Sequence, residues 1–148
     1  MEALTDLVGT ERGTSCWFET SQADVDAHAE TVGDGGWIHN DVEASAAGPY
    51  GGTILQGFFM LSSLSRMARN LELPSEGVFN RFNYGFDRVR FVSQVPTGTR
   101  IRGRFTVAEV ESRPDGDERG RLTAVVEAEG IDRPAVVADW LIYFRYGS

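Results

Sequence analysis

Two residues capable of acid–base chemistry stand close together in a glycine-rich stretch of the chain. Asp34 and His39 are separated by four residues within segment 33–57, GDGGWIHNDVEASAAGPYGGTILQG. A carboxyl group and an imidazole can each accept or donate a proton near neutral pH when their surroundings are suitable. The apolar run that follows predicts a buried helix, with Gln56 and Gly57 at its N-terminus. An acid, a base and a helix N-terminus suit acid–base chemistry on a carbonyl compound.

The composition narrows the class of protein. The 148 residues are predicted to form one domain, residues 1–148, and 41% of them are hydrophobic, which is enough for a core. A net charge of -8 argues against nucleic acid as a partner, because phosphate binding needs a basic surface. All 14 basic residues are arginine, which excludes Schiff-base lysine chemistry and a P-loop.

The sequence also predicts where the protein works. No apolar run reaches 18 residues, and no signal peptide opens the chain. Cys16 is the single cysteine, so an internal disulfide cannot form. We therefore expect a soluble, cytoplasmic protein with no membrane partner.

The N-terminal part contains one recognisable helix. Residues 1–14 show little pattern and are predicted to be a loosely held arm, whereas residues 16–20 are predicted to form a short strand. Ser21 and Asp24 have the spacing of a capping box, and Gly33 suits the position after a helix end. A helix is therefore expected between Ser21 and Gly33.

The central part is predicted to be a loop followed by a buried helix. Residues 33–52 are rich in glycine, while residues 53–70 are apolar around most of a helical circumference. Arg66 and Arg69 mark the exposed end of that helix. His28, on the preceding helix, is interpreted as a packed residue without a chemical role.

The C-terminal half alternates with a period of two. Residues 82–95, 101–107, 122–127 and 136–145 are predicted strands, and residues 114–117, PDGD, are a predicted turn. Long strands with short connections predict an antiparallel sheet. The fold class is therefore α+β, with one sheet face wrapping the helix and the other meeting water. The water-facing side chains are expected to include Arg102, Arg104, Glu127 and Arg145.

Three blocks of sequence resemble the MaoC-like dehydratases, which include the (R)-specific enoyl-CoA hydratases and have the hotdog fold. The resemblance covers nearly the whole chain, with the blocks in the family's order around a buried helix. The matching residues are Gly33-Asp34 with His39, Ser45 and residues 48–57, then 83–91, then Arg133-Pro134-Ala135.

The resemblance implies a hotdog domain in which a curved antiparallel sheet wraps a long central helix. It implies a homodimer whose two sheets join, enoyl thioester substrates, usually of coenzyme A, and no metal or redox cofactor. Two positions depart from the commoner family pattern. Gly36-Trp37 stands in place of Asn-Pro, as in a branch of the family with Trp-Ile-His, and Gln56 stands in place of His or Ser.

The resemblance also implies roles for the site residues. Asp34 and His39 are expected to share a water molecule and to act together, with His39 polarising it and Asp34 completing the proton transfer. The Gly57 N–H is the expected donor to the thioester oxygen, because a helix N-terminus offers unpaired N–H groups. Gln56 either adds a substrate contact or only packs. Ser65 either orients Asp34 or is a plain hydroxyl.

Other assignments stay open at this point. Arg88 and Arg90 either meet coenzyme A phosphates or pair with acidic side chains. The runner-up function is a hotdog tailoring enzyme that dehydrates or cyclises a carrier-bound or free intermediate. A hotdog thioesterase or a non-catalytic binding protein is the third reading. Residues 54–65 contain no Asp or Glu, which disfavours a thioesterase, and a binding protein has no need of the Asp34–His39 pair.

Overall fold

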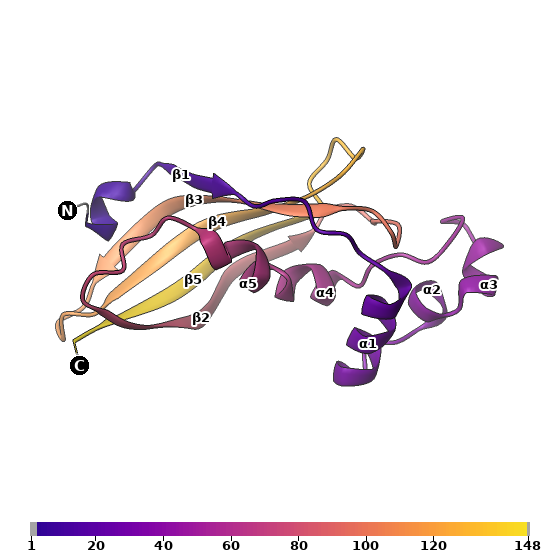
Figure 1. The fold of residues 1–148 in the computed structure, drawn as a ribbon, viewed down its shortest axis with the longest axis horizontal. Coiled ribbons are helices and arrows are strands. Elements are labelled where there is room, and N and C mark those ends of the chain that lie inside the picture. Colours follow the sequence, from indigo (N-terminus) through magenta and orange to yellow (C-terminus); the bar gives the residue numbers. More distant parts are fainter. Residues whose placement is uncertain (1–2, 148) are drawn as a thin grey trace.

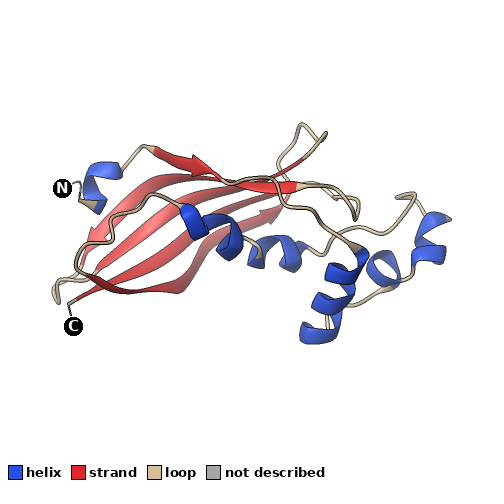
Figure 2. Cartoon of the chain, in the orientation of Figure 1, coloured by secondary structure: helices blue, strands red, loops and turns tan. Residues whose placement is uncertain are grey.

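The computed structural model describes residues 3–147, in which five antiparallel strands form one curved sheet. Figure 1 shows the sheet curving along a row of short helices, and Figure 2 shows the same arrangement by element type. The order across the sheet is β1-β3-β4-β5-β2. The strands are β1 (Glu11–Thr14), β2 (Val78–Phe91), β3 (Ile101–Ser112), β4 (Glu118–Ala128) and β5 (Val136–Tyr146). The predicted antiparallel α+β fold is confirmed.

Side-chain alternation along the strands separates the core from the outer face. In β4 every second residue is buried, as expected for a sheet with one covered face. The buried side chains include Ile101, Phe105, Leu122, Val126 and Phe144. On the outer face Glu127 lies between Arg102 and Arg104 and pairs with both, and Arg145 pairs with Asp117. These cross-strand ion pairs confirm the predicted water-facing side.

The N-terminal segment corrects one expectation. Residues 1–14 were expected to be a loose arm, but within the described part Leu4–Leu7 forms a 3-10 helix and β1 pairs with β3. Leu4 and Leu7 are buried at the sheet. These two leucines, three residues apart, pack at the edge of the core. Two residues are too few to show as a periodic pattern in the sequence. The predicted strand at residues 16–20 is instead extended chain with one bridge, from Phe18 to Ile101.

Three short helices lie together beyond one end of the sheet (Figure 1). They are α1 (Gln22–Val32), α2 (Trp37–Asn40) and α3 (Val42–Ala46). The predicted capping box of Ser21 with Asp24 is present at the start of α1. The predicted loop over residues 33–52 was wrong in part, because it contains α2 and α3. The Asp41 side chain caps α3 by accepting a hydrogen bond from the Ala44 N–H. Aspartate is a common residue at the start of a helix, but within this glycine-rich segment the signal was missed.

The central helix is shorter than the predicted span of residues 53–70. Thr53–Gln56 is extended, and the helical part consists of α4 (Gly57–Ser62), α5 (Leu64–Met67) and the 3-10 turn Ala68–Asn70. The interruption lies at Ser63, whose hydroxyl, like that of Ser62, donates to the Phe59 carbonyl. Serine hydroxyls that compete for backbone carbonyls weaken and bend helices.

The sheet covers only one side of this helix. Met60, Leu64 and Met67 are buried, but Phe58 is 59% exposed, so the expected burial around the circumference is not reached within one chain. Between residues 3 and 147, no helix is both long and apolar enough to cross a membrane.

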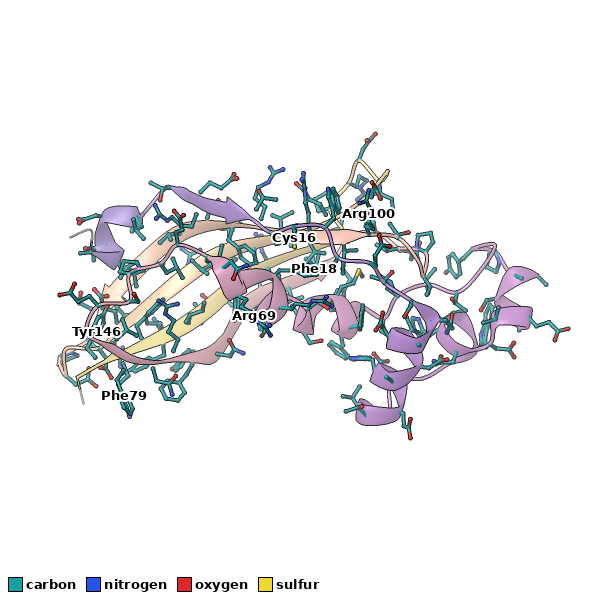
Figure 3. The ribbon with its side chains drawn as sticks, in the orientation of Figure 1. Cys16, Phe18, Arg69, Phe79, Arg100 and Tyr146 are labelled. Atoms are coloured by element: carbon teal, nitrogen blue, oxygen red, sulfur yellow. The ribbon has the colours of Figure 1, made fainter. Side chains whose placement is uncertain are left out.

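Strand β2 forms an edge of the sheet with large apolar side chains in the open. It pairs only with β5, and most of its residues are exposed. Phe79, which is 65% exposed, projects away from the sheet (Figure 3). The other exposed aromatic residues of β2 are Phe82, Tyr84, Phe86 and Phe91. An open edge of this kind favours pairing with another strand.

Candidate active site

The position of Asp34 follows from the way α1 ends. Gly33 has the left-handed conformation, with φ of 74°, and its N–H donates to the Ala29 carbonyl at 2.9 Å. Glycine adopts this conformation without steric cost, and the reversal ends the helix. Asp34 consequently lies against α1, with its Oδ2 3.6 Å from Nε2 of His28.

Gln56 holds the backbone of Asp34 in place. Its side chain is fully buried, and its Nε2 donates to the Val25 carbonyl at 2.9 Å and to the Asp34 carbonyl at 3.3 Å. The Gln56 amide thus connects α1, and Asp34 just beyond its end, to the start of α4. A substrate contact by Gln56 stays a prediction, while its contact with Asp34 is direct.

His39 lies on α2 with its ring fixed at one nitrogen. Nδ1 is 2.7 Å from the carbonyl oxygen of Ile54. A carbonyl can only accept a hydrogen bond, so Nδ1 carries the proton and the neutral ring presents the lone pair of Nε2. An imidazole in this tautomer is prepared to take a proton from a bound molecule at Nε2.

A group of polar contacts holds α2 in place. Nε2 of Gln22 donates to the His39 carbonyl at 2.7 Å, and the Thr53 hydroxyl donates to Oε1 of Gln22 at 2.6 Å. The buried Ser45 hydroxyl donates to the Trp37 carbonyl at 2.6 Å. Only a small side chain fits there and reaches the carbonyl, which explains why residue 45 is serine.

One extended segment brings the two candidate catalytic residues together. The ring of His39 contacts the carbonyl of Ile54, and the Asp34 carbonyl contacts the side chain of Gln56, two residues further on. Two residues of extended chain span roughly 6.5 Å. No direct hydrogen bond or ion pair joins Asp34 to His39 within residues 3–147.

Gly57 begins α4, as the sequence predicted. The Met60 N–H makes the first intrahelical bond, to the Gln56 carbonyl at 3.2 Å, so the Gly57 N–H has no intrahelical acceptor. Gly57 also packs against a neighbour, because a Cβ there would lie 2.9 Å from the ring of Phe91. The structure therefore gives this glycine a packing role. Its role as a hydrogen-bond donor to the substrate stays a prediction.

An apolar cavity of about 420 Å³ lies between α1, α4, α5 and strands β2 and β5. His28, the neighbour of Asp34, is part of its wall. Most of the other lining residues are apolar, which suits a hydrocarbon chain. They are Val32, Phe58, Leu61, Ser62, Leu64, Ser65, Asn83, Phe86 and Trp140.

Comparison with known proteins decides the family. A family model described as a MaoC like domain matches residues 4–129. The chain belongs to this family. It is 36% identical to a 3-hydroxyacyl-thioester dehydratase Z of Mycobacterium tuberculosis, across 97% of this chain and 96% of that protein. It is also 37% identical to nodulation protein N of Rhizobium meliloti, across 97% and 89% of the two chains.

Solved structures show the fold of this MaoC-like chain. An R-hydratase of Pseudomonas aeruginosa superposes with a TM-score of 0.74 at 20% identity, covering 95% of this chain and 83% of that one. An (R)-hydratase of A. caviae also gives a TM-score of 0.74 at 20% identity, with coverage of 91% and 94%. The expected hotdog fold is confirmed.

The MaoC-like site contains a contact that the sequence did not reveal. His28 was interpreted as a packed residue without a chemical role, yet its Nε2 lies 3.6 Å from the Asp34 carboxylate. The sequence did contain one signal for this contact, the glycine at residue 33 that ends α1. Because the chain reverses direction at Gly33, Asp34 lies beside the last turns of α1. Ser65 is exposed and makes no contact with Asp34 among the described residues.

The two arginines considered for coenzyme A have protein partners in this MaoC-like chain. Arg88 lies 3.5 Å from the Asp139 carboxylate, and Arg90 donates to the Val89 carbonyl at 2.7 Å. Both side chains lie on the exposed strand β2. The contact of Arg88 agrees with pairing to an acidic side chain, whereas the acceptor of Arg90 is a backbone carbonyl, and phosphate binding by either stays a prediction.

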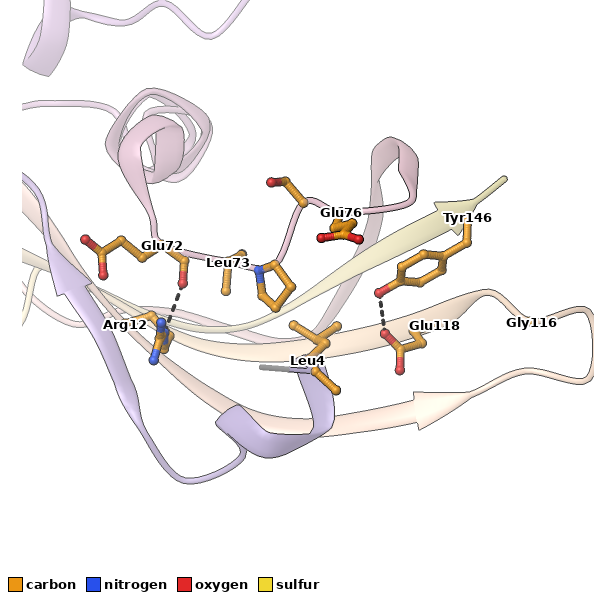
Figure 4. A pocket seen from close by; sticks show the side chains of 11 residues that line it. Leu4, Arg12, Glu72, Leu73, Glu76, Gly116, Glu118 and Tyr146 are labelled. Carbon is orange, nitrogen blue, oxygen red and sulfur yellow. Dashed lines mark hydrogen bonds between the residues drawn. The ribbon is translucent and has the colours of Figure 1, made fainter. Parts of the chain in front are cut away.

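A larger cavity, of about 660 Å³, lies near both termini, at the end of the sheet away from α1, α2 and α3 (Figure 1), and is drawn from close by in Figure 4. Its wall includes the carboxylates of Glu72, Glu76 and Glu118, and Tyr146 donates to Glu118 at 2.6 Å. These three carboxylates outnumber Arg12, the arginine in the same wall, so the cavity is unfavourable for an anionic thioester. The smaller apolar cavity, whose wall includes His28 but neither Asp34 nor His39, is therefore the candidate site for the substrate's acyl chain.

Tyr146 gives a prediction about alkaline stability. Burial and the hydrogen bond to Glu118 raise the pKa of Tyr146 from 10.0 to about 12. Between these values the folded chain keeps a proton that the unfolded chain loses. The stabilisation is therefore fully present below pH 10 and is lost as pH rises through 12. The free energy of unfolding is expected to fall less steeply with pH in Tyr146→Phe than in the wild type.

Urea unfolding at several values between about pH 9 and about pH 12 measures this slope. The chain suits the experiment because it has no lysine to titrate in the same range. Tyr50→Phe, at an exposed tyrosine, is the matched control and should keep the wild-type slope. Equal slopes for Tyr146→Phe and the wild type would contradict the assignment.

Proposed function

We propose that this MaoC-like protein is a hydro-lyase that adds water to a trans-2-enoyl thioester, or removes it from the product. The proposed pair is trans-2-enoyl-CoA and (R)-3-hydroxyacyl-CoA. The observation that carries the proposal is the tautomer of His39, whose Nε2 lone pair is left available by the contact of Nδ1 with Ile54. The name of the mycobacterial relative, a 3-hydroxyacyl-thioester dehydratase, describes chemistry of the same kind.

The proposed mechanism uses Asp34 and His39 on one water molecule. In hydration, the water oxygen forms a bond to Cβ while its proton passes to Nε2 of His39. The π electrons of the double bond move to Cα, which takes a proton from Asp34. Transfer of a proton from His39 to Asp34 restores the starting state, so one water is consumed. The proposed reaction needs no metal or redox cofactor.

Two further features support this mechanism. The Gly57 N–H, which has no acceptor within its own helix, is the proposed donor to the thioester oxygen, which gains negative charge as the enolate develops. The apolar cavity beside His28 and Leu61 is the proposed place for the acyl chain.

The test is hydration of crotonyl-CoA by the purified protein, followed as loss of enoyl absorbance. A longer trans-2-enoyl-CoA is assayed in parallel, because the cavity is large enough for more than two methylene groups. A 3-hydroxyacyl-CoA dehydrogenase specific for one stereoisomer then reports the configuration of the product. Turnover by the wild type, and not by Asp34→Asn, supports the proposal. No turnover with either ester contradicts it and favours the tailoring-enzyme reading.

We also propose that the protein is a homodimer joined along β2. The open edge and the exposed Phe79, Phe82 and Tyr84 are arranged for twofold pairing with a second copy. Light scattering is expected to give twice the mass of the chain at micromolar concentration. Tyr84→Glu places a charge at this edge and should shift the mass toward that of one chain.

The matched control for the dimer is Val8→Glu. Val8 is 47% exposed and lies outside β2, so the same charge there should leave the mass unchanged. A wild-type protein with the mass of a single chain would disprove the dimer. An unchanged mass in Tyr84→Glu would place the interface elsewhere.

A further inference from the structure

The imidazole of His28 is buried without a complete set of partners. Its side chain is 12% exposed, and the ring meets Phe59 edge-to-face at 5.8 Å between centroids. Nε2 is fully shielded from solvent and has no hydrogen-bond partner within residues 3–147. Leaving a buried polar atom unpaired is unfavourable, so such an atom calls for a specific explanation.

The Asp34 carboxylate has one side-chain neighbour to which it can bind. In the part of the chain that the structure describes, its only polar contact is with His28 Nε2, at 3.6 Å. The nearby Ser62 hydroxyl, which lines the same cavity, donates to the Phe59 carbonyl instead. The backbone of Asp34 is held by Gln56, but nothing else fixes the direction of its carboxylate.

We propose that His28 is a positioning residue for Asp34 in the reaction proposed above. Nε2–H of His28 donates to Oδ2 of Asp34 and thereby directs the second carboxyl oxygen toward the shared water. An N–H···O hydrogen bond is about 2.7–3.2 Å long, so the two groups need to approach by less than about 1 Å. This inference rests on the proposed role of Asp34 as a proton carrier.

The kinetic test uses two substitutions of similar size. His28→Phe keeps a ring against Phe59 and removes the nitrogen, whereas His28→Gln keeps an amide N–H near the position of Nε2. We expect His28→Phe to lower kcat by roughly 10- to 100-fold, since a misplacement of 1 Å can cost about 10²-fold. KM and the melting temperature should change little, and His28→Gln should recover most of the lost kcat.

A second measurement is independent of activity. The chain has only two histidines, so the ring nitrogen signals of ¹⁵N-labelled protein are assigned by comparing His28→Phe with His39→Asn. Asp34→Asn removes the carboxylate and is expected to shift the Nε2 signal of His28 at fixed pH. Tyr50→Phe, at an exposed tyrosine, is the control and should leave that signal in place.

The outcomes separate this inference from the proposed function. An unshifted Nε2 signal in Asp34→Asn overturns the contact, whether or not the enzyme is active. A shifted signal with wild-type kcat in His28→Phe overturns the positioning role. A wild-type protein inactive on both enoyl esters contradicts the proposed function, and the NMR shift then decides the His28–Asp34 contact alone. A shifted signal together with a kcat loss that His28→Gln recovers supports the inference.

Discussion

Asp34→Asn is expected to lower kcat for hydration of crotonyl-CoA by about 10²–10⁴-fold, the usual contribution of a positioned acid–base group. Asparagine keeps the size of the side chain and cannot donate a carboxylic proton to Cα. The backbone contact of residue 34 with Gln56 does not use the replaced group, so the fold should be retained. Steady-state kinetics and a melting temperature on the same sample measure both effects.

The role of His39, the partner of Asp34, is tested with two substitutions. His39→Asn places its amide nitrogen near Nδ1 and keeps a donor for the Ile54 carbonyl, but it lacks the atom corresponding to Nε2. His39→Gln keeps a polar atom near Nε2 and loses the donor. Both are expected to lose activity by about 10²–10⁴-fold, with His39→Asn the better folded. Retention of most of the wild-type rate in Asp34→Asn or His39→Asn would refute the assignment.

Gly57→Val is expected to reduce kcat by about 10²–10³-fold, the loss known for removal of an oxyanion donor. A Cβ at residue 57 keeps the carbonyl of the thioester away from the N–H. The hydrogen bond strengthens as the oxygen gains enolate charge, so kcat should fall more than KM rises. Gly57→Ala is the smaller change and should show the same direction.

The contact with Phe91 complicates this experiment and also supplies its control. A Cβ at residue 57 would lie 2.9 Å from that ring, and overpacking typically costs about 1–3 kcal/mol of stability. Phe91→Leu makes space at the start of α4, and leucine keeps an apolar side chain against Phe58. The double variant Gly57→Ala/Phe91→Leu is therefore expected to regain the melting temperature without regaining kcat.

The two roles of Gly57 lead to opposite results in the double variant. If Gly57 serves packing alone, the double variant should be both stable and active. If it provides the oxyanion donor, activity stays low although stability returns. Phe91→Leu by itself should keep the wild-type kcat, which shows that the ring is not part of the chemistry.

Local patterns in the sequence were sufficient for strands β3, β4 and β5 and for the ends of α1. The strands from Ile101 to Tyr146 alternate with a period of two, because one face of the sheet is buried and the other meets water. The capping box at Ser21 and the left-handed Gly33 involve neighbours within four residues. Interactions of this range leave a direct trace in residue types and spacing.

The interruption of the central helix and the order at the N-terminus were not predictable in the same way. Ser62 and Ser63 bend the helix by binding one carbonyl, although the apolar pattern continues through them. Leu7 is buried because the sheet passes over it, and its sequence neighbours give no sign of this. In both places a contact specific to the folded chain outweighs the local pattern.

The sequence by itself identified Asp34, His39 and Gly57 as candidates, through residue type, spacing and resemblance. Only the tertiary structure showed that Ile54 fixes the tautomer of His39 and that His28 faces Asp34. The contact of His39 joins residues 15 apart, and that of Gly57 with Phe91 joins segments on two different elements. Such pairs become neighbours when the chain packs, and packing geometry is not encoded in the spacing of residues along the chain.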